Sequence, residues 1–519
     1  MRKRALLTLT LLIFTFGTSL AEDAAWDNAI KSGDEFLRSG RYSQAEQSYQ
    51  VAVRKAEEFG DQDQRLADSL NGLASVYKEQ GRYTEAMEVC QRALTIWEMI
   101  FGPDHPDVAA GLNNVANLYV NQGFFAQAQP LMQRALTIIE RTRSAEHPNL
   151  ATILNNLGEL YRKQARYPEA EQLFRRSLTI REKALGGEHF EVAESLCNLA
   201  AVYGNQGRYD EATQLYQQSL LICEKSLGPQ HPEVARVLNN LGHLRCTQGH
   251  YVEAESLLRR ALSIWEKTLG PEHPSVAASL DNLGRVSYQL GQYAEAGLLI
   301  QRARAIWEKV LGKDHLLVAE SLSSMASVYT VQDRFPGAER LSRRALAIRE
   351  RALGSNHPDV ATALSNLAVI LRAQRQPVQC ELLYRRSLSI REKTLGPDHP
   401  DVATSLTNLA SIYFEEGKYG KAEELLRRAA AITEKSLGSE HRELAKILEN
   451  LATTYECQKR YPEAERYRQR SLAIQEKVLA ANHPDMVENL KRHATFLRKL
   501  NRTAEAELID ERIKSFSAK

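Results

Sequence analysis

The stretch LGPDHPDVATSLTNLASIYFEEGKYGKAEELLRRAAAITEKS, residues 395–436, decides the fold of this chain. Its pattern recurs, with substitutions, from Trp26 to the C-terminus, and its histidine recurs every 42 residues. A fixed period of this kind is typical of repeat architectures. The repeat histidines are His105, His147, His189, His231, His273, His315, His357, His399, His441 and His483.

Each 42-residue unit predicts two antiparallel helices. Pro400 suits the first position of a helix, where its missing N–H is not needed. Apolar residues from Val402 to Tyr413 then follow at three- and four-residue spacing, which places them on one helical face. Residues 416–418 carry the glycine of a turn, and a second apolar face continues from Tyr419.

Two positions of the second helix are restricted in size. A small residue lets the two helices of a pair approach closely, and an aromatic residue three positions earlier fills the gap to the next pair. The small residues are Ala45, Ala86, Ala128, Ala170, Ala212, Ala254, Ala296, Ala338, Ala422, Ala464 and Ala506, with Cys380 as the exception. The aromatic residues are Tyr42, Tyr83, Phe125, Tyr167, Tyr209, Tyr251, Tyr293, Phe335, Tyr419 and Tyr461.

This pattern resembles that of the tetratricopeptide repeat family. The family residues are matched by Leu406, Leu409, Ala410, Tyr413, Ala422, Leu426 and Ala429. The usual unit has 34 residues, and the longer unit with its L-G-x-x-H-P-x-V-A lead-in is similar to the repeats of kinesin light chain and its bacterial relatives. The resemblance implies an all-α fold, a right-handed α-solenoid of about twelve helix-turn-helix hairpins.

Residues 1–21 differ from the repeats and predict a secretory signal peptide. Residues 2–4 are basic, residues 5–16 are apolar apart from threonines, and residues 19–21 read Ser-Leu-Ala, a typical cleavage pattern. A retained membrane anchor is the less favoured alternative, because the apolar run is short for a membrane span. We therefore expect an exported protein, periplasmic or extracellular, with no integral membrane segment after cleavage.

Residues 22–519 predict a single solenoid. The first repeat, residues 26–59, lacks the His-Pro lead-in, and 42-residue repeats fill residues 60–484. The last repeat, residues 485–519, carries polar residues where the others carry asparagine, leucine and an aromatic. Polar replacement is typical of a terminal repeat whose outer face meets water.

The repeat near residues 361–394 is the most irregular. Arg375, Pro377 and Cys380 stand where other repeats carry the turn residue, the aromatic and the alanine. A hinge is one interpretation, and sequence drift in a repeat held by its neighbours is the one we favour.

Composition and motifs restrict the function classes. The 519 residues include 43% hydrophobic and 25% charged residues with a formal net charge of +2, which becomes −1 without residues 2–4. A nearly neutral chain without a basic tail argues against nucleic acid as the partner. No G-x-S-x-G, P-loop or H-E-x-x-H motif occurs, so we expect neither an enzyme nor a cofactor.

Histidine and cysteine predict no metal site. Equivalent histidines on packed helices lie roughly 8–10 Å or more apart, whereas metal ligands converge on one ion. The histidines are instead expected to start helices. The six cysteines fall at six different repeat positions, so no disulfide framework is indicated, and one pair among Cys197, Cys223 and Cys246 stays open.

An asparagine series on the first helices is the main candidate site. A carboxamide both donates and accepts, so a ladder of asparagines can pair with the backbone of an extended peptide. In the resembled family this position lines the concave face. The alternative, weighed equally, is that the asparagines bind neighbouring helices and set the repeat stagger. The series is Asn114, Asn156, Asn198, Asn240, Asn282, Asn366, Asn408 and Asn450.

Neighbouring groove positions carry charge. Arg236, His243 and Arg285 interleave with the middle asparagines and form a candidate basic cluster for a carboxylate or an acidic motif. Glu159 and Glu194 make the groove mixed in sign.

One late position on the second helix accepts either tryptophan or arginine, which predicts a half-exposed site. A second contact surface is possible there, and packing under the next hairpin is the favoured interpretation. These residues are Trp97, Trp265 and Trp307, and Arg181, Arg349 and Arg391.

Two hypotheses follow. The first is an exported, non-catalytic scaffold that binds a peptide or an extended partner segment in its concave groove. The second is a structural assembly subunit that contacts folded partners or copies of itself through its edges and convex face.

Overall fold

The structure of the chain, a computed structural model, describes residues 23–143, 147–479 and 483–517. The predicted signal peptide lies outside these residues. The described residues form helices and turns, without strands. After a first helix over residues 23–38, the helices are α2 (Tyr42–Glu57), α3 (Gln64–Glu79), α4 (Tyr83–Phe101), α5 (Pro106–Asn121), α6 (Phe125–Thr142), α7 (Pro148–Lys163), α8 (Tyr167–Leu185), α9 (Phe190–Asn205), α10 (Tyr209–Leu227), α11 (Pro232–Gln248), α12 (Tyr251–Leu269), α13 (Pro274–Gln289), α14 (Tyr293–Val310), α15 (Leu316–Val331), α16 (Phe335–Leu353), α17 (Pro358–Ala373), α18 (Pro377–Leu395), α19 (Pro400–Glu415), α20 (Tyr419–Leu437), α21 (Arg442–Cys457), α22 (Tyr461–Val478), α23 (Pro484–Lys499) and α24 (Thr503–Ser517).

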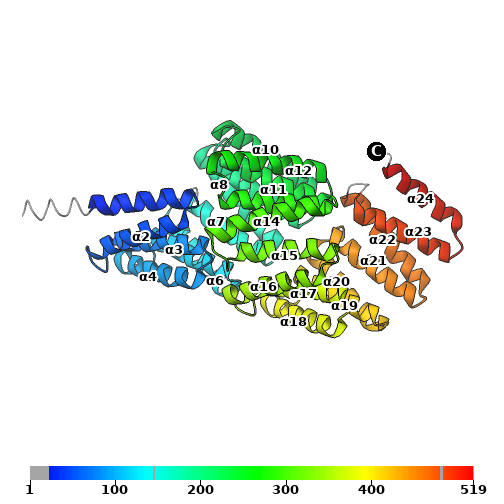
Figure 1. Cartoon of the computed structure of the whole chain (residues 1–519). Coiled ribbons are helices and arrows are strands. Elements are labelled where there is room, and N and C mark those ends of the chain that lie inside the picture. Colours follow the sequence, from blue (N-terminus) through cyan, green and yellow to red (C-terminus); the bar gives the residue numbers. More distant parts are fainter. Residues whose placement is uncertain (1–22, 144–146, 480–482, 518–519) are drawn as a thin grey trace, which may run out of the picture.

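Successive helices pair into hairpins that stack along the chain. Hairpin 1 joins residues 23–38 to α2, hairpin 2 joins α3 to α4, and the series continues to hairpin 12, made of α23 and α24. Figure 1 shows this succession from the blue N-terminal hairpins to the red C-terminal ones. The all-α solenoid expected from the repeat is confirmed. No described helix has the length and apolar character that crossing a membrane requires.

The histidine lead-in starts the first helix of each hairpin. In hairpin 10, Nδ1 of His399 accepts a hydrogen bond from the backbone N–H of Asp401 at 3.1 Å, and Pro400 is the first helical residue. The side chain thereby pairs one of the N–H groups that a helix start leaves free. All ten repeat histidines cap in this way, and Asp63 takes the role in hairpin 2.

Small side chains hold each pair of helices together. Ala422 and its equivalents are fully buried, and Cys380 is buried equally well in the irregular repeat. All six cysteines are free thiols, so the pairing left open by the sequence is not formed.

The tryptophan and arginine position is buried at five of its six residues, so the expectation of a half-exposed site was wrong there, and only Arg349 is half-buried. Trp97, Trp265 and Trp307 are 2–5% exposed, and Arg181 and Arg391 are both 5% exposed. The two residue types are interchangeable because both fill the space under the next hairpin. Polar partners are available there to both residue types: Arg181 donates to the Ser195 hydroxyl, and Nε1 of Trp265 donates to the backbone oxygen of Pro232 at 3.1 Å.

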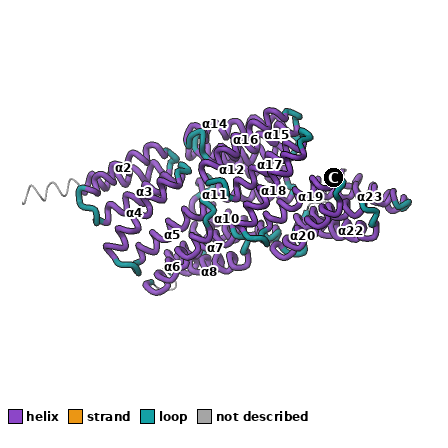
Figure 2. Tube along the Cα trace, turned by 90° about the horizontal axis from the view of Figure 1, so that it is seen from below, coloured by secondary structure: helices purple, strands orange, loops and turns teal. Residues whose placement is uncertain are grey.

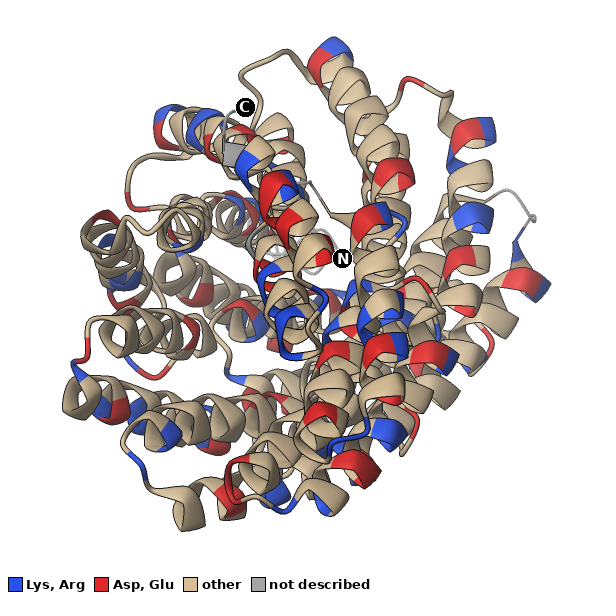
Figure 3. Cartoon of the chain, turned by 90° about the vertical axis from the view of Figure 1, so that its right-hand side faces the viewer, with Lys and Arg blue, Asp and Glu red and all other residues tan. Residues whose placement is uncertain are grey.

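The second helices are linked by a row of ion pairs on the outer surface. An arginine of one hairpin pairs with a glutamate 36 residues earlier, as Arg428 does with Glu392 at 2.7 Å. Exposed pairs of this kind stabilise little individually. Figure 3 shows basic and acidic residues interspersed over the helices rather than gathered on one face.

The solenoid winds tightly enough for hairpins six apart to touch. Nε2 of His315 lies 3.2 Å from the backbone oxygen of Glu79, and Nε2 of His399 lies 3.4 Å from that of Lys163. The end of α14, with Val310, packs against the apolar cluster around Tyr42 of hairpin 1. Figure 2 shows α14 beside the N-terminal hairpins. We call this line of contacts, between the lead-ins of hairpins 7–12 and the helix–helix turns of hairpins 1–6, the seam.

Glycine is required where a turn lies under the seam. A Cβ on Gly123 would lie 2.7 Å from the ring of His357, whereas a Cβ on Gly291, in a turn outside the seam, would meet nothing within 4 Å. The six turns under the seam carry Gly40, Gly81, Gly123, Ala165, Gly207 and Gly249, and the six outside it carry Gly291, Asp333, Arg375, Gly417, Lys459 and Asn501, all at positive φ. Large residues therefore occur only where no histidine packs on the turn.

The aromatic position follows the same division. Tyr209 is 6% exposed under the seam, whereas Tyr293 and Tyr461 are 36% and 38% exposed outside it. The helix–helix turn of the irregular repeat, before Pro377, lies outside the seam, where neither a small turn residue nor an aromatic is needed. Sequence drift in a repeat held by its neighbours stays the favoured interpretation of these departures.

Candidate protein-binding groove

The first helices form the inner layer of the solenoid. The first helices of successive hairpins contact one another: α11 contacts α13, and α13 contacts α15. The second helices of successive hairpins contact one another less closely. The asparagine series lies on this inner layer, where side chains from neighbouring hairpins come within reach of each other.

Half of the asparagine series binds the neighbouring hairpin. Nδ2 of Asn156 donates to Oδ1 of Asn113 at 3.0 Å, and Asn113 is itself buried. This bond joins α7 to α5 and fixes their stagger, which was one of the two interpretations of the series. The same bond is made by Asn114 to Asn71, by Asn198 to Asn155 and by Asn282 to Asn239.

The other half keeps its carboxamides free. The residue that would accept the bond is Cys197, Ser323, Ser365 or Thr407 in these hairpins instead of asparagine. Within the described chain no side-chain hydrogen bond forms from the free members, which are half-buried or, in one case, exposed. They are Asn240, Asn366, Asn408 and Asn450. Three of them lie on hairpins 9–11, so the groups free to bind a ligand gather in the C-terminal half.

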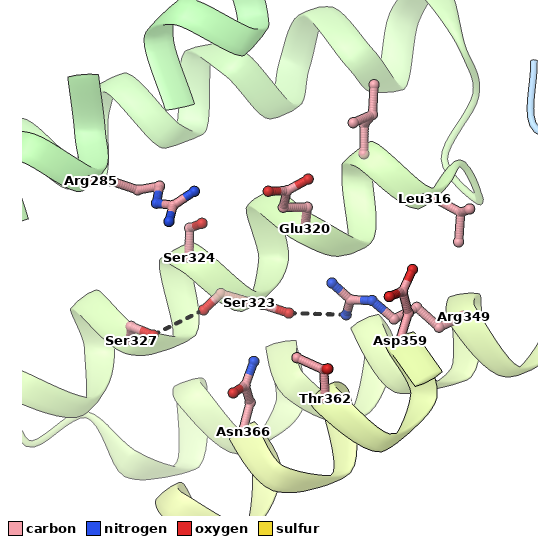
Figure 4. Close-up of a pocket in the computed structure, with 11 residues that line it drawn as sticks. Arg285, Leu316, Glu320, Ser323, Ser324, Ser327, Arg349, Asp359, Thr362 and Asn366 are labelled. Atoms are coloured by element: carbon pink, nitrogen blue, oxygen red, sulfur yellow. Dashed lines mark hydrogen bonds between the residues drawn. The ribbon is translucent and has the colours of Figure 1, made fainter. Parts of the chain in front are cut away.

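A cavity of about 470 Å³ opens on the inner layer between hairpins 7 and 9. Figure 4 shows Arg285, Ser324 and Glu320 facing Asn366, Thr362 and Arg349 across it. Three serines on α15 replace larger residues and leave the space open: Ser323, Ser324 and Ser327.

Arg349 is the least paired of the inward-facing arginines of its series. Its guanidinium donates to the Ser323 hydroxyl at 3.1 Å. Arg391, the equivalent residue in the next hairpin, donates to Thr362, to Ser405 and to a backbone oxygen. Ala363 occupies the position of Ser405 in the hairpin that Arg349 faces. Burial lowers the pKa of Arg349, and the cavity therefore offers a desolvated guanidinium with donors to spare.

A buried carboxyl lies beside this cavity. Asp281 is 3% exposed, and its Oδ1 has no hydrogen-bond donor among the described residues. Burial, together with the charge of Glu320, raises the pKa of Asp281 to about 7, although Ser324 and Arg285 act in the opposite direction.

His243 and Arg285 share a second cavity of about 300 Å³. Arg442 and Lys446, from the hairpin across the seam, line it as well, and both pair with Asp485. Desolvation lowers the pKa of His243 and the charge of Arg285 lowers it further, so the ring is neutral at pH 7, although the residue is exposed.

Arg236 is separate from that pair. It is half-buried and bound to Glu233 at 2.7 Å. Glu159 and Glu194 are likewise paired, with Arg162 and Arg181 respectively. The sequence did not indicate Arg442 or Lys446 as groove residues, because the seam that brings α21 to α11 has no signature in a single repeat. Arg349 was expected to pack under the next hairpin and instead lines the cavity between hairpins 7 and 9.

A third cavity, of about 470 Å³, continues the inner surface across the seam. Asn408 and Asn450 line it from one side, and Asn205 and Tyr209 line it from the other. The free asparagines of hairpins 9–11 thus line cavities on adjacent hairpins rather than widely separated sites.

Comparison with known proteins agrees with the fold. A model of the tetratricopeptide repeat matches residues 107–183, 191–267, 234–297, 288–351, 318–393, 359–435 and 443–513, and a second matches residues 66–107. The chain belongs to the tetratricopeptide repeat family. No curated protein matched it.

Two solved structures are similar to parts of this tetratricopeptide repeat protein. One is a putative kinesin light chain of Podosopora anserina with nearly identical TPR-like repeats, 30% identical, covering 40% of this chain and 97% of its own, with a TM-score of 0.34. The other is BtubC (BKLC) from P. vanneervenii, 22% identical, covering 45% of this chain and 92% of its own, with a TM-score of 0.35.

Proposed function

We propose that this protein is an exported, non-catalytic interaction scaffold that binds an extended segment of a protein partner in the groove of hairpins 8–11. The observation that carries the proposal is the set of unpaired carboxamides on the inner layer, Asn366, Asn408 and Asn450. Each offers a donor and an acceptor to a peptide backbone. The repeat fold supplies the surface, because repeat proteins bind along extended concave faces.

The polar groups around Arg349 would add selectivity. A desolvated guanidinium beside serine and threonine hydroxyls suits a carboxylate or a backbone carbonyl of the bound segment. Glu320 and Asp359 line the same cavity and would disfavour a strongly acidic ligand there. A mixed polar segment therefore fits the cavity better than a run of acidic residues.

The test is affinity capture from the envelope and culture fractions with three forms of the protein. The groove variant carries Asn366→Ala, Asn408→Ala and Asn450→Ala. The control variant carries Gln217→Ala, Gln218→Ala and Gln301→Ala, which remove exposed carboxamides from second helices. We expect the groove variant alone to lose the partner, with an unchanged thermal melt.

The opposite result has a defined meaning. A partner retained by the groove variant would contradict groove binding and favour the assembly-subunit hypothesis. Exposed apolar residues on the second helices, such as Val252 at 77% and Val378 at 72% exposure, are the surface that such an assembly would use.

A further inference from the structure

Two of the six seam histidines, His315 and His399, form hydrogen bonds with both ring nitrogens. In His315, Nδ1 accepts the capping hydrogen bond from the N–H of Leu317 at 3.1 Å, so the proton of the neutral ring is on Nε2. Nε2–H then donates to the backbone oxygen of Glu79 in hairpin 2. His399 makes the same pair of bonds, to the N–H of Asp401 and to the oxygen of Lys163.

This arrangement needs a neutral ring. A protonated imidazole has no acceptor for the capping N–H. It also places a positive charge at a helix N-terminus, where the helix dipole is itself positive. At the seam the charge would be buried as well: His357, His441 and His483 are 9%, 8% and 4% exposed.

The chain contains its own comparison. His105, His147, His189 and His231 have the same sequence position and make the same capping bond, but they belong to hairpins 3–6, and among the described residues no hairpin lies six places earlier to pack on their rings. Burial lowers the pKa of all six seam histidines, most clearly that of His483, to about 4: His273, His315, His357, His399, His441 and His483.

The charged groups that face the seam rings are of both signs, and their effect on the histidine pKa values does not outweigh the effect of burial. Acidic residues two positions after the ring favour the protonated form at four sites: Asp359, Asp401, Glu443 and Asp485. Glu79 does so at His315 from the preceding turn of the superhelix. Basic residues from the seam and from neighbouring hairpins oppose it: Lys163, His250, Arg391, Arg442 and Lys446. Around His273 the cavity is lined by Arg41, Glu272 and Lys309.

We propose that the seam is a pH-sensitive closure. With the six seam histidines neutral, hairpins 7–12 close on hairpins 1–6. Protonation of these histidines separates the two sets of hairpins and opens the part of the groove that lies between them. The direction of the pH dependence follows from the lowered pKa values of the seam histidines. Stabilisation of the closed form is complete above the ordinary histidine pKa of 6.5 and is lost as the pH falls toward 4. The consequence for a groove ligand rests on the proposed function, whereas the closure itself does not.

The experiment is small-angle X-ray scattering of the mature chain at pH 7.5 and in steps down to pH 4.5, with helicity followed by circular dichroism. The seam variant has asparagine at all six seam histidines, because asparagine caps a helix well but does not titrate in this range. The control variant has His105→Asn, His147→Asn, His189→Asn and His231→Asn.

We expect the wild type and the control variant to gain radius of gyration and maximum dimension reversibly as the pH falls, with helicity unchanged. The seam variant should have the same dimensions at both ends of the range. A wild type of constant dimensions, or a seam variant that still expands like the control, would overturn the proposal. If the six-site variant does not fold, the pair His315→Asn and His399→Asn, compared with His147→Asn and His231→Asn, gives the same contrast in smaller amplitude.

Scattering also separates this proposal from the proposed function. Loss of the pH response with partner capture intact would remove the closure and leave the groove assignment standing. A pH response in a protein that captures no groove partner would support the closure and contradict the groove assignment.

Discussion

Nε2 of His315 donates a hydrogen bond to the backbone oxygen of Glu79, a residue 236 positions earlier in the chain. A solenoid is commonly treated as a stack in which each repeat touches only its neighbours. Here the same residue that begins a helix also joins two turns of the superhelix. Contacts between distant hairpins therefore add a restraint that nearest-neighbour packing alone does not supply.

Replacing Gly123 with lysine should open the seam locally. The new Cβ would lie 2.7 Å from the His357 ring, and overpacking of this kind costs about 1–3 kcal/mol. Gly291→Lys is the matched control, since both glycines have positive φ, 73° and 77°, and lysine already stands at the equivalent Lys459. We expect scattering to show expansion at pH 7.5 only for Gly123→Lys. Equal dimensions and equal melting temperatures for the two variants would contradict the seam.

Asn156→Ala should destabilise hairpins 3 and 4. It leaves the buried Oδ1 of Asn113 without its donor, which costs about 1–3 kcal/mol. Asn366→Ala, at an equivalent position with a free carboxamide, should change stability by less than about 0.5 kcal/mol. Hydrogen exchange of α5 and α7 measures the local effect. Similar protection in both variants would mean that the asparagine bond does not hold the stagger.

Asp281→Asn should stabilise the protein in a pH-dependent manner. The pKa of Asp281 is raised from 3.8 to about 7, so the ionised form destabilises the folded state above pH 3.8 and does so fully above pH 7. The gain on substitution should therefore grow from near zero at pH 4 to at most roughly 4 kcal/mol at pH 8. Urea unfolding at pH 5 and pH 8 measures it. Asn71, Asn113, Asn155 and Asn239 show that asparagine fits this position. A gain that is equal at both pH values would place the effect outside this carboxyl.

Arg468→Leu should cost about 3–5 kcal/mol, because it leaves Glu449 buried without its partner. Adding Glu449→Thr should recover most of the loss. Leucine and threonine occupy the two equivalent positions in hairpin 10, Leu426 and Thr407. Thermal melts of the single and double variants test the pair. A double variant as unstable as the single one would show that the ion pair is not the reason for the loss.

The asparagine series illustrates how far a repeat pattern reaches. Its position on the first helix was evident from the period, and so were the two roles open to it. Which members take which role depends on the residue one position earlier in the preceding hairpin. Asn198 finds Asn155 and bonds to it, whereas Asn240 meets Cys197 and does not. This pairing becomes visible only when the stagger of neighbouring hairpins is known.

The position that carries tryptophan or arginine shows where a prediction from residue type was wrong. A site that accepts Trp265 and Arg391 suggested partial exposure, because charged residues are seldom fully buried. The structure gives both Nη atoms of Arg391 internal acceptors: Thr362, Ser405 and a backbone oxygen. Residue type alone does not report the polar partners that burial provides.

The sequence by itself determined the hairpins, their number and order, the capping histidines and the face that each helix buries. All of these depend on contacts within one repeat or between adjacent ones, and such contacts recur at the repeat period. Only the tertiary structure decided the seam and the cavities along it. The seam depends on a small rotation between successive hairpins, summed over six of them until His357 meets Gly123. No single repeat encodes that sum, although its trace is present in the printed sequence as small residues at the turns of the first six hairpins and larger ones at most of the last six.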